Sequence, residues 1–253
     1  MEKIDSHTIF VEPFHVDFTG RIFMGVLGNH LLNAAGNHSQ RRGWGIGALN
    51  ETSHTWVLSR LSIEMTRMPR QFQHCTVRTW VESVMRLFTN RNFAILDSDG
   101  QPMGYARSVW AMIDLGTRLP CDLLSLYDGD ILNYVVDQED NVCPIEGHGR
   151  FRFRDARLVR TIDTYYSDVD INGHINSIKY IEHILDLFGN ENFEHGIRRF
   201  EIAYKAESHM GDRLSFFVQD NADAGGTDVE IRKNVTDANP GDVVCQARVI
   251  FNK

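Results

Sequence analysis

Residues 167–188, SDVDINGHINSIKYIEHILDLF, join a polar run directly to an apolar helical pattern. The polar run contains Asp168, Asp170, Asn172 and His174. The apolar residues recur at helical spacing: Ile175, Ile178, Ile181, Leu185 and Phe188. This pattern predicts a helix that packs one face against a core. The polar residues then lie at its N-terminal end, where backbone N–H groups lack partners and the helix dipole is positive.

A calcium loop is one interpretation of this polar run. Asp168, Asp170 and Asn172 match the start of an EF-hand loop, but the twelfth position, which requires a bidentate Glu, is Lys179. The segment before the loop, DARLVRTIDTYY, is rich in β-branched and aromatic residues, as strands are, whereas an EF-hand needs a helix there. The sequence therefore predicts no metal site.

A catalytic turn is the other interpretation. A helix N-terminus can stabilise the negative charge that develops on an attacked carbonyl oxygen. A histidine beside carboxylate or carboxamide groups can orient and deprotonate a water molecule. The competing structural explanation is that Asp170 or Asn172 only caps the helix and that His174 is a satisfied polar residue.

The order of predicted elements occurs twice along the chain. A strand-like segment (residues 8–18) and a helical pattern (residues 25–43) precede several extended runs, with the turn DSDGQP between two of them. A strand-like segment, the 167–188 helix and further extended runs then repeat this order. The repetition predicts a duplicated α+β unit. We place the first unit at residues 1–120, a packed linker at 121–149 and the second unit at 150–253.

Composition excludes several classes of protein. The net charge of −8 argues against nucleic-acid binding, which needs excess Lys and Arg. The four cysteines lie far apart without zinc-ligand spacing, which is typical of reduced thiols in a cytoplasmic protein. The first residues, MEKIDSHTIFVEPF, contain no long apolar run, so we expect neither a signal peptide nor membrane insertion. The letters Gly43-x-Gly45-x-x-Ala48 follow a helical pattern rather than a strand, so we expect no dinucleotide cofactor.

The motif D-x-N-x-H-x-N-x-x-K-Y-I, from Asp170 to Ile181, strongly resembles the active-site segment of plant and bacterial acyl-ACP thioesterases. The stretches NHLLNAAGNH, TWVLSRLSIEMTRMP and EIAYKAESHMGDRL extend the resemblance over nearly the whole chain. The resemblance implies a tandem hotdog fold, in which each half wraps a curved antiparallel sheet around one long helix. It also implies hydrolysis of fatty acyl-ACP to free fatty acid in fatty acid biosynthesis, without a cofactor. The partner would be acyl carrier protein with its phosphopantetheine-linked acyl chain.

Alternatives remain open at this point. An acyl-CoA thioesterase or a hotdog dehydratase would have the same fold, and a non-catalytic acyl-binding protein would belong to a different class. A buried polar cluster speaks against a mere binder, which does not need one. The sequence also leaves open whether the chain forms a homodimer.

The resemblance also implies roles for individual residues. The resemblance assigns catalysis to Asp170, Asn172, His174 and Glu207, and it places Ser208 where plant members carry a cysteine. We favour direct hydrolysis, with Glu207 as general base on a water molecule and Asp170 and His174 holding polar groups in register. Asn172 and helix N–H groups would polarise the thioester carbonyl. Attack by Ser208 is the alternative, although a serine hydroxyl is a far weaker nucleophile than a thiolate.

Two further sets of residues are predicted to contact the substrate. In the family the N-terminal half forms the acyl tunnel, which here implicates Met24, Val26, Leu27 and Leu31. The basic segment GRFRFRDARLVR is the candidate docking site for the acidic carrier. On a strand its Arg152 and Arg154 would share one solvated face. The alternative is a charged edge strand that discourages aggregation.

Overall fold

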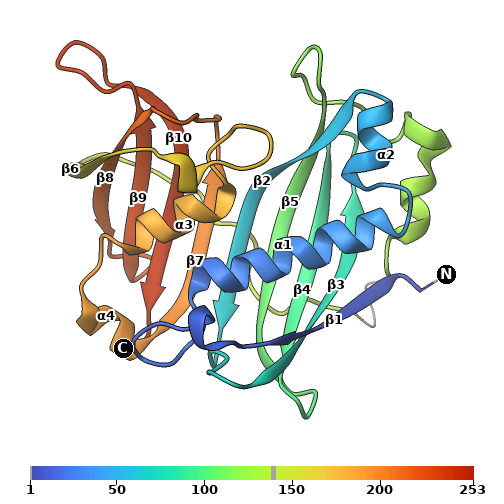
Figure 1. The fold of residues 1–253 in the computed structure, drawn as a ribbon, viewed down its shortest axis with the longest axis horizontal. Coiled ribbons are helices and arrows are strands. Elements are labelled where there is room, and N and C mark those ends of the chain that lie inside the picture. The colour runs from blue at the N-terminus through green and yellow to red at the C-terminus, as the bar shows by residue number, and fades with distance from the viewer. Residues whose placement is uncertain (1, 138–140) are drawn as a thin grey trace. The chain divides into compact units, whose positions relative to one another are not determined.

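The chain folds into two units, unit 1 (Met1–Gly147) and unit 2 (His148–Lys253). The computed structural model describes residues 2–137 and 141–253. Figure 1 shows an antiparallel sheet and a helix lying across it in each unit. This is the hotdog architecture, and its occurrence in both units confirms the predicted tandem hotdog.

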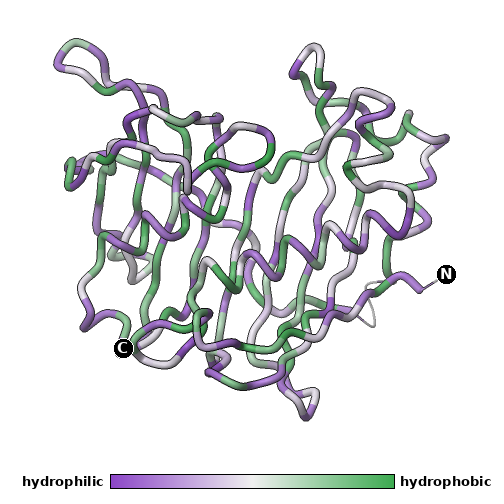
Figure 2. Tube along the Cα trace, in the orientation of Figure 1, coloured by the Kyte–Doolittle hydropathy of each residue, from purple (hydrophilic) through white to green (hydrophobic). Residues whose placement is uncertain are grey.

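In unit 1, five antiparallel strands pair in the order β1-β3-β4-β5-β2. Their bounds are β1 Ile4–Phe10, β2 His54–Met65, β3 His74–Val84, β4 Phe88–Leu96 and β5 Pro102–Asp114. The predicted turn between β4 and β5 is confirmed, because Asp97 Oδ1 accepts the backbone N–H groups of Asp99 and Gln101. This turn is hydrophilic in Figure 2, as its exposure requires.

The long helix of unit 1, α1 (Met24–Gln40), contacts β3 and β1. Its buried residues recur three or four positions apart: Met24, Leu27, Leu31, Ala34, Ala35 and His38. This spacing puts them on one face, which packs against the sheet. The helix ends before Gly43, which has a φ of +78°, and α2 (Ile46–Glu51) follows.

In unit 2, five antiparallel strands pair in the order β7-β10-β9-β8-β6. Their bounds are β6 Arg157–Asp163, β7 Ile197–Tyr204, β8 Arg213–Asn221, β9 Gly226–Lys233 and β10 Asp242–Phe251. The helix α3 (Ser177–Leu185) buries Ile178 and Ile181, as the apolar pattern predicts, but its next buried aliphatic residue is Ile184, whereas the predicted Leu185 is half-buried. It spans only nine residues, so Phe188 lies beyond it, and α4 (Asn190–His195) follows.

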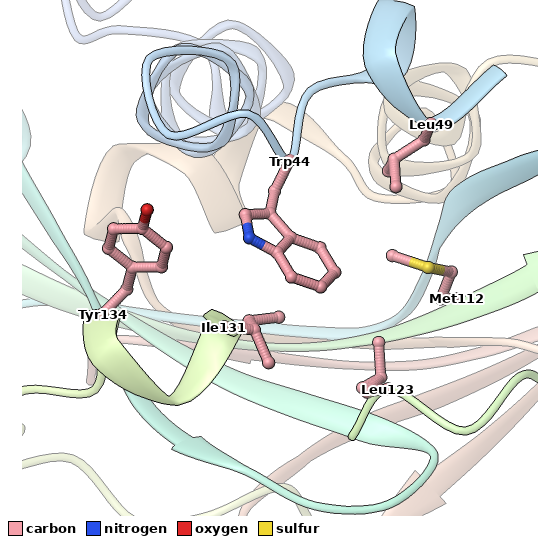
Figure 3. Packing of buried hydrophobic residues seen from close by; sticks show 6 residues of the cluster. All are labelled: Trp44, Leu49, Met112, Leu123, Ile131 and Tyr134. Carbon is pink, nitrogen blue, oxygen red and sulfur yellow. The ribbon is translucent and has the colours of Figure 1, made fainter. Parts of the chain in front are cut away.

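The segment predicted as a linker belongs to unit 1. The 3₁₀ segment η2 (Leu126–Tyr134) packs Ile131 and Tyr134 into a cluster with Trp44, as Figure 3 shows. Leu123 joins the same cluster. Burial of these apolar side chains stabilises the segment against unit 1, although turn-forming residues lie between them. Unit 1 therefore extends to Gly147 instead of residue 120. Residues 138–140 of the predicted linker lie outside the described residues.

Two composition-based expectations can be compared with the structure. All four cysteines are free thiols. Within residues 2–137 and 141–253, no helix is both long and apolar enough to cross a membrane.

Candidate active site

The loop formed by residues 169–176, here named the His174 loop, connects β6 and η4 (Tyr166–Asp168) to α3. The carboxylate of Asp170 stabilises the conformation of this loop by accepting hydrogen bonds from its backbone. Its Oδ1 accepts the backbone N–H groups of Asn172 at 2.8 Å and of His174 at 3.2 Å. Gly173 reverses the chain with a φ of +80°, a conformation that side-chain-bearing residues rarely adopt. Asp170 therefore fixes the backbone that carries His174.

His174 and Glu207 are brought together across unit 2. Nε2 of His174 lies 3.5 Å from Oε2 of Glu207, which follows the end of β7. The side chains are 25% and 41% exposed, so solvent reaches both groups. Nζ of Lys233, at the end of β9, donates to the backbone carbonyl of Glu207 at 2.6 Å and so fixes the backbone of Glu207. A carboxylate and an imidazole in this arrangement can share the proton of a bound water molecule.

Asn172 lies in the exposed turn of the His174 loop and does not reach the start of the helix as a cap. The N-cap of α3 is Asn176, whose Oδ1 accepts the N–H of Ile178 at 2.9 Å. Neither Asp170 nor Asn172 therefore caps the helix, contrary to the structural alternative raised by the sequence. The sequence alone does not single out Asn176, because it offers three Asx residues within seven positions, all of them good caps.

Ser208 is fully buried, and its Oγ has no hydrogen-bond partner among the described residues. Burial raises the pKa of the neighbouring Tyr180 hydroxyl, and the Ser208 side chain lowers this pKa by a smaller amount. The backbone carbonyl of Ser208 accepts the N–H of Ile175 at 2.8 Å. The structure thus brings Glu207, and not the Ser208 hydroxyl, to His174.

Several supporting contacts were not predicted from the sequence. The side chain of His183 on α3 lies with Nε2 2.9 Å from Oδ1 of Asp168, and the other oxygen of Asp168 accepts the N–H of Tyr165 at 2.8 Å. His209 places its ring edge-on to His174, with centroids 5.1 Å apart. The sequence marks Asp168 through its motif position, but nothing in it pairs this residue with His183.

Unit 1 contains a loop with the same backbone as the His174 loop. Oδ1 of Asp17 accepts the N–H groups of Thr19 and Arg21, as Asp170 does for Asn172 and His174. In unit 1, Ile22 donates to the carbonyl of Pro69, and in unit 2 Ile175 donates to that of Ser208. The bridges Arg21–Arg70 and His174–His209 correspond in the same way.

The comparison of the two loops separates scaffold from chemistry. Arg21 and Met68 occupy the positions of His174 and Glu207, while the aspartate is present in both loops. The position of Ser208 is taken by Pro69, which has no hydroxyl group. Of these two loops, only the one in unit 2 is associated with a histidine and a glutamate at these positions. The aspartate and a buried residue at the position of Ser208 occur in both units, so they serve a backbone shape that does not require the His174–Glu207 pair.

The predicted tunnel residues lie on the first turns of α1. Met24, Leu27 and Leu31 are buried in the core of unit 1, and Val26 is half-buried. Unit 1 contains a cavity of about 360 Å³ beside the C-terminal half of α1, and none of the four lines it.

Arg152 and Arg154 are exposed, as predicted, but they do not lie on a strand. β6 begins only at Arg157. The segment before it is bound by the side chain of Gln219 on β8 instead of by a neighbouring strand. Its Oε1 accepts the N–H of Arg154 at 2.8 Å, and its Nε2 donates to the carbonyl of Arg152 at 3.1 Å. These side-chain contacts replace ladder hydrogen bonds, so the predicted strand is shorter than its alternating sequence indicates.

The described part of the chain contains no group of three or more His, Cys, Asp or Glu side chains placed to hold a metal ion. Lys179, at the position where a calcium loop would need its glutamate, lies within α3 and pairs with Glu182 at 2.7 Å.

The chain matches one family over most of its length. Residues 6–127 match the acyl-ACP thioesterase N-terminal domain, and residues 154–253 match the acyl-ACP thioesterase C-terminal domain. The solved structure of an acyl-ACP thioesterase from Bacteroides thetaiotaomicron is 53% identical, with a TM-score of 0.90, and the match covers 99% of this chain and 98% of that one. The 12:0-ACP thioesterase from Umbellularia californica has a TM-score of 0.83 at 18% identity, covering 100% and 98% of the two chains, which shows a common fold.

Curated relatives are more distant. The oleoyl-acyl carrier protein thioesterase 1 of Arabidopsis thaliana is 25% identical over 86% of this chain, and a palmitoyl-acyl carrier protein thioesterase of Gossypium hirsutum is 28% identical over 72%. The matches span 64% and 46% of the lengths of these two relatives. Together with the two domain matches and the fold, they show that the chain belongs to the acyl-ACP thioesterase family.

Proposed function

We propose that the protein hydrolyses the thioester of fatty acyl-ACP, releasing free fatty acid and the carrier for fatty acid biosynthesis. The observation that carries this proposal is the 3.5 Å approach of His174 to Glu207, two residues of the segment that matches the acyl-ACP thioesterase C-terminal domain. The pair is exposed to solvent, as a site that uses water must be. The four free thiols are consistent with a reducing compartment such as the cytoplasm.

In the proposed reaction Glu207 removes a proton from a water molecule, and the resulting hydroxide attacks the thioester carbonyl. His174 lies against the carboxylate and orients both the water and Glu207. The tetrahedral intermediate then collapses with loss of the phosphopantetheine thiolate, a good leaving group that needs little acid assistance. Asp170 contributes as a positioning residue, because it holds the backbone N–H of His174. Asn172 is exposed in the turn of the His174 loop, and we assign its carboxamide to polarise the thioester carbonyl.

The experiment offers acyl-ACP and acyl-CoA of the same chain length to the protein and identifies products by mass spectrometry. We expect free fatty acid from acyl-ACP and a kcat/KM at least about tenfold lower for acyl-CoA, because only the carrier adds a docking surface. A preference for acyl-CoA would point to the alternative thioesterase, and binding without release of fatty acid would point to a non-catalytic protein.

Variants of the pair test the chemistry. Glu207→Gln and His174→Ala should each lower kcat about 100-fold or more, because general acid–base groups contribute at least that much. Both side chains are partly exposed, so the fold should survive, as circular dichroism and the melting temperature can show. Glu182→Gln, which removes a carboxylate of similar exposure on α3, is the matched control and should retain the rate. Full activity in either pair variant would contradict the assigned roles.

A further inference from the structure

A second histidine, His209, lies beside His174 and has no role in the reaction proposed above. The two imidazole rings meet edge to face, with centroids 5.1 Å apart and an interplanar angle of 76°. The two residues also face each other along the backbone, where they form an antiparallel bridge. His209 is exposed, and the side chain of His174 is 25% exposed. Each ring can therefore exchange a proton with water.

Hydrogen bonds hold the backbone of both histidines in place. The N–H of His209 donates to Oδ2 of Asp212 at 2.9 Å, and its carbonyl accepts the hydroxyl of Thr164, also at 2.9 Å. On the other side of the bridge, Oδ1 of Asp170 accepts the N–H of His174 at 3.2 Å. The separation of the two rings is therefore set by the segments that carry them.

The groups around His174 act on its charge in opposite ways. The carboxylate of Glu207, 3.5 Å away, favours an imidazolium at His174. A protonated His209 disfavours it, because two like charges at this separation repel each other. Further charged groups near the two histidines are Asp170, Asp212 and Lys233, whose Nζ lies 4.0 Å from Asp212. The last two have opposite signs and largely offset each other, so the charge that varies beside His174 is that of His209.

The charge of His174 matters for the reaction. A carboxylate beside an imidazolium is a weaker base than one beside a neutral imidazole, so protonation of His174 would disable Glu207. We propose that His209 is a positioning residue that, when protonated, opposes a proton on His174 and so keeps the His174–Glu207 pair active in mildly acidic solution. Histidine side chains change charge in this range of pH. The effect on rate rests on the proposed function, whereas the effect on the charge of His174 does not.

The equivalent position in unit 1 shows which side chains this backbone accepts. Arg70 occupies the position of His209, and its N–H donates to Oε1 of Gln73 at 2.9 Å, as the N–H of His209 does to Asp212. An arginine, which keeps its charge at every relevant pH, is therefore compatible with the turn. His209→Arg supplies a permanent charge, and His209→Gln supplies a neutral side chain. The two variants thus bracket the natural residue.

Titration of His174 by NMR measures the charge effect without any substrate. The histidines are isotopically labelled, and the imidazole signal of His174 is identified by its loss in His174→Gln. We expect the midpoint of the His174 titration in His209→Gln to lie at least about half a pH unit above that in His209→Arg, as two partly hydrated charges at this separation produce. The unaltered protein should lie between the two variants, and high salt should narrow the difference.

The matched control for this titration is His195→Gln, because His195 is an exposed histidine of the same unit, on α4. It should leave the midpoint of His174 unchanged. If the two rings of His174 and His209 only pack together, both substitutions of His209 remove the same contact and shift the midpoint in the same direction. Such a result, or coincident midpoints, would overturn the proposal.

The rate provides a second readout. The acid limb of kcat/KM for acyl-ACP should lie at the lowest pH in His209→Arg and at the highest in His209→Gln. Coincident acid limbs in variants that still hydrolyse acyl-ACP would overturn the role of His209 and leave the hydrolase proposal in place. Absence of hydrolysis in the unaltered protein would instead contradict the proposed function, and the NMR titration would still decide whether His209 controls the charge of His174.

Discussion

His183 on α3 lies with its Nε2 2.9 Å from Oδ1 of Asp168, and this contact fastens the helix to the turn that leads into the His174 loop. Asp168 is 7% exposed and His183 21%. Removing one member of such a pair leaves a buried polar group without its partner.

Asp168→Ala is accordingly expected to lower the free energy of unfolding by about 3 kcal/mol. His183→Ala should cost less, because this side chain is more exposed. A double-mutant cycle in chemical denaturation measures the coupling, and we expect the double variant to lose less than the two single losses combined. Strict additivity would show that the contact does not contribute to stability.

The paired aspartates Asp17 and Asp170 allow a control within the same molecule. Each accepts two backbone N–H groups in its own loop, so Asp17→Ala and Asp170→Ala should each destabilise the protein by about 1 to 2 kcal/mol. Only Asp170→Ala should also lower kcat, by about tenfold or more, because His174 then loses its fixed position. Thermal unfolding and steady-state hydrolysis provide the two readouts. A similar loss of kcat in both variants would mean that the effect comes from stability alone.

Removal of the Ser208 hydroxyl distinguishes the two nucleophiles. Ser208→Ala should retain kcat within a few-fold and should not reduce stability, because the Oγ is buried without a hydrogen-bond partner among the described residues. Stopped reactions analysed by intact-protein mass spectrometry provide a second readout. An acyl adduct on Ser208 would contradict attack by water.

The exposed arginines before β6 are the proposed docking site for acyl-ACP. Arg152→Glu combined with Arg154→Glu should raise KM for acyl-ACP about tenfold and weaken its dependence on salt, while a small soluble thioester is hydrolysed at the normal rate. Arg213→Glu is the control, because Arg213 is 72% exposed in the same unit. An unchanged KM would place the docking site elsewhere, and equal losses on both substrates would assign the two arginines to the fold.

His38 should make stability depend on pH. Burial and Arg91 lower its pKa in the folded protein to about 3, against an ordinary value of 6.5. The unfolded chain therefore binds a proton that the folded chain does not, between pH 6.5 and about 3, and stability falls as the pH falls through this range. Nearby Arg42 lowers the same pKa, and Asp5 raises it by a smaller amount.

The variant His38→Gln should flatten this part of the stability profile relative to the unaltered protein. Denaturation at a series of pH values measures the slope, which one proton can change by at most about 1.4 kcal/mol per pH unit. As a control, substitution of the exposed His195 by Gln should leave the dependence of stability on pH close to that of the unaltered protein. An unchanged slope in His38→Gln would show that the pKa of His38 does not differ between the folded and the unfolded protein.

Much of the fold could be predicted because its signals are local. The spacing of Leu27, Leu31 and Ala34 specifies the buried face of α1, and the Asp99–Gly100 pair specifies a turn whatever lies around it. The extent of unit 1 could not be predicted, because Ile131 and Tyr134 sit among turn-forming residues and acquire their role only by packing against Trp44. Local preference and tertiary burial conflict there, and burial decides.

The same limit applies to the candidate site. The family resemblance predicted roles for His174 and Glu207, and in the structure Nε2 of His174 lies 3.5 Å from Oε2 of Glu207. The sequence could not show which Asx residue caps α3, since Asp170, Asn172 and Asn176 are all suitable by type. Nor could it pair Asp168 with His183 or Lys233 with the Glu207 carbonyl, because these contacts depend on how separate strands and helices meet in space. The strand predicted at Arg152 and Arg154 is absent, because the side chain of Gln219 supplies the hydrogen bonds that a neighbouring strand would have supplied.

The two equivalent loops also bear on how the halves of the chain diverged. The same backbone turn carries an arginine at residue 21 and a histidine at residue 174, and the facing position accepts either methionine or glutamate. One main-chain conformation is thus compatible with different side chains at the positions of His174, Glu207 and Ser208, so the two halves can differ in their chemistry without a change in the backbone of the turn.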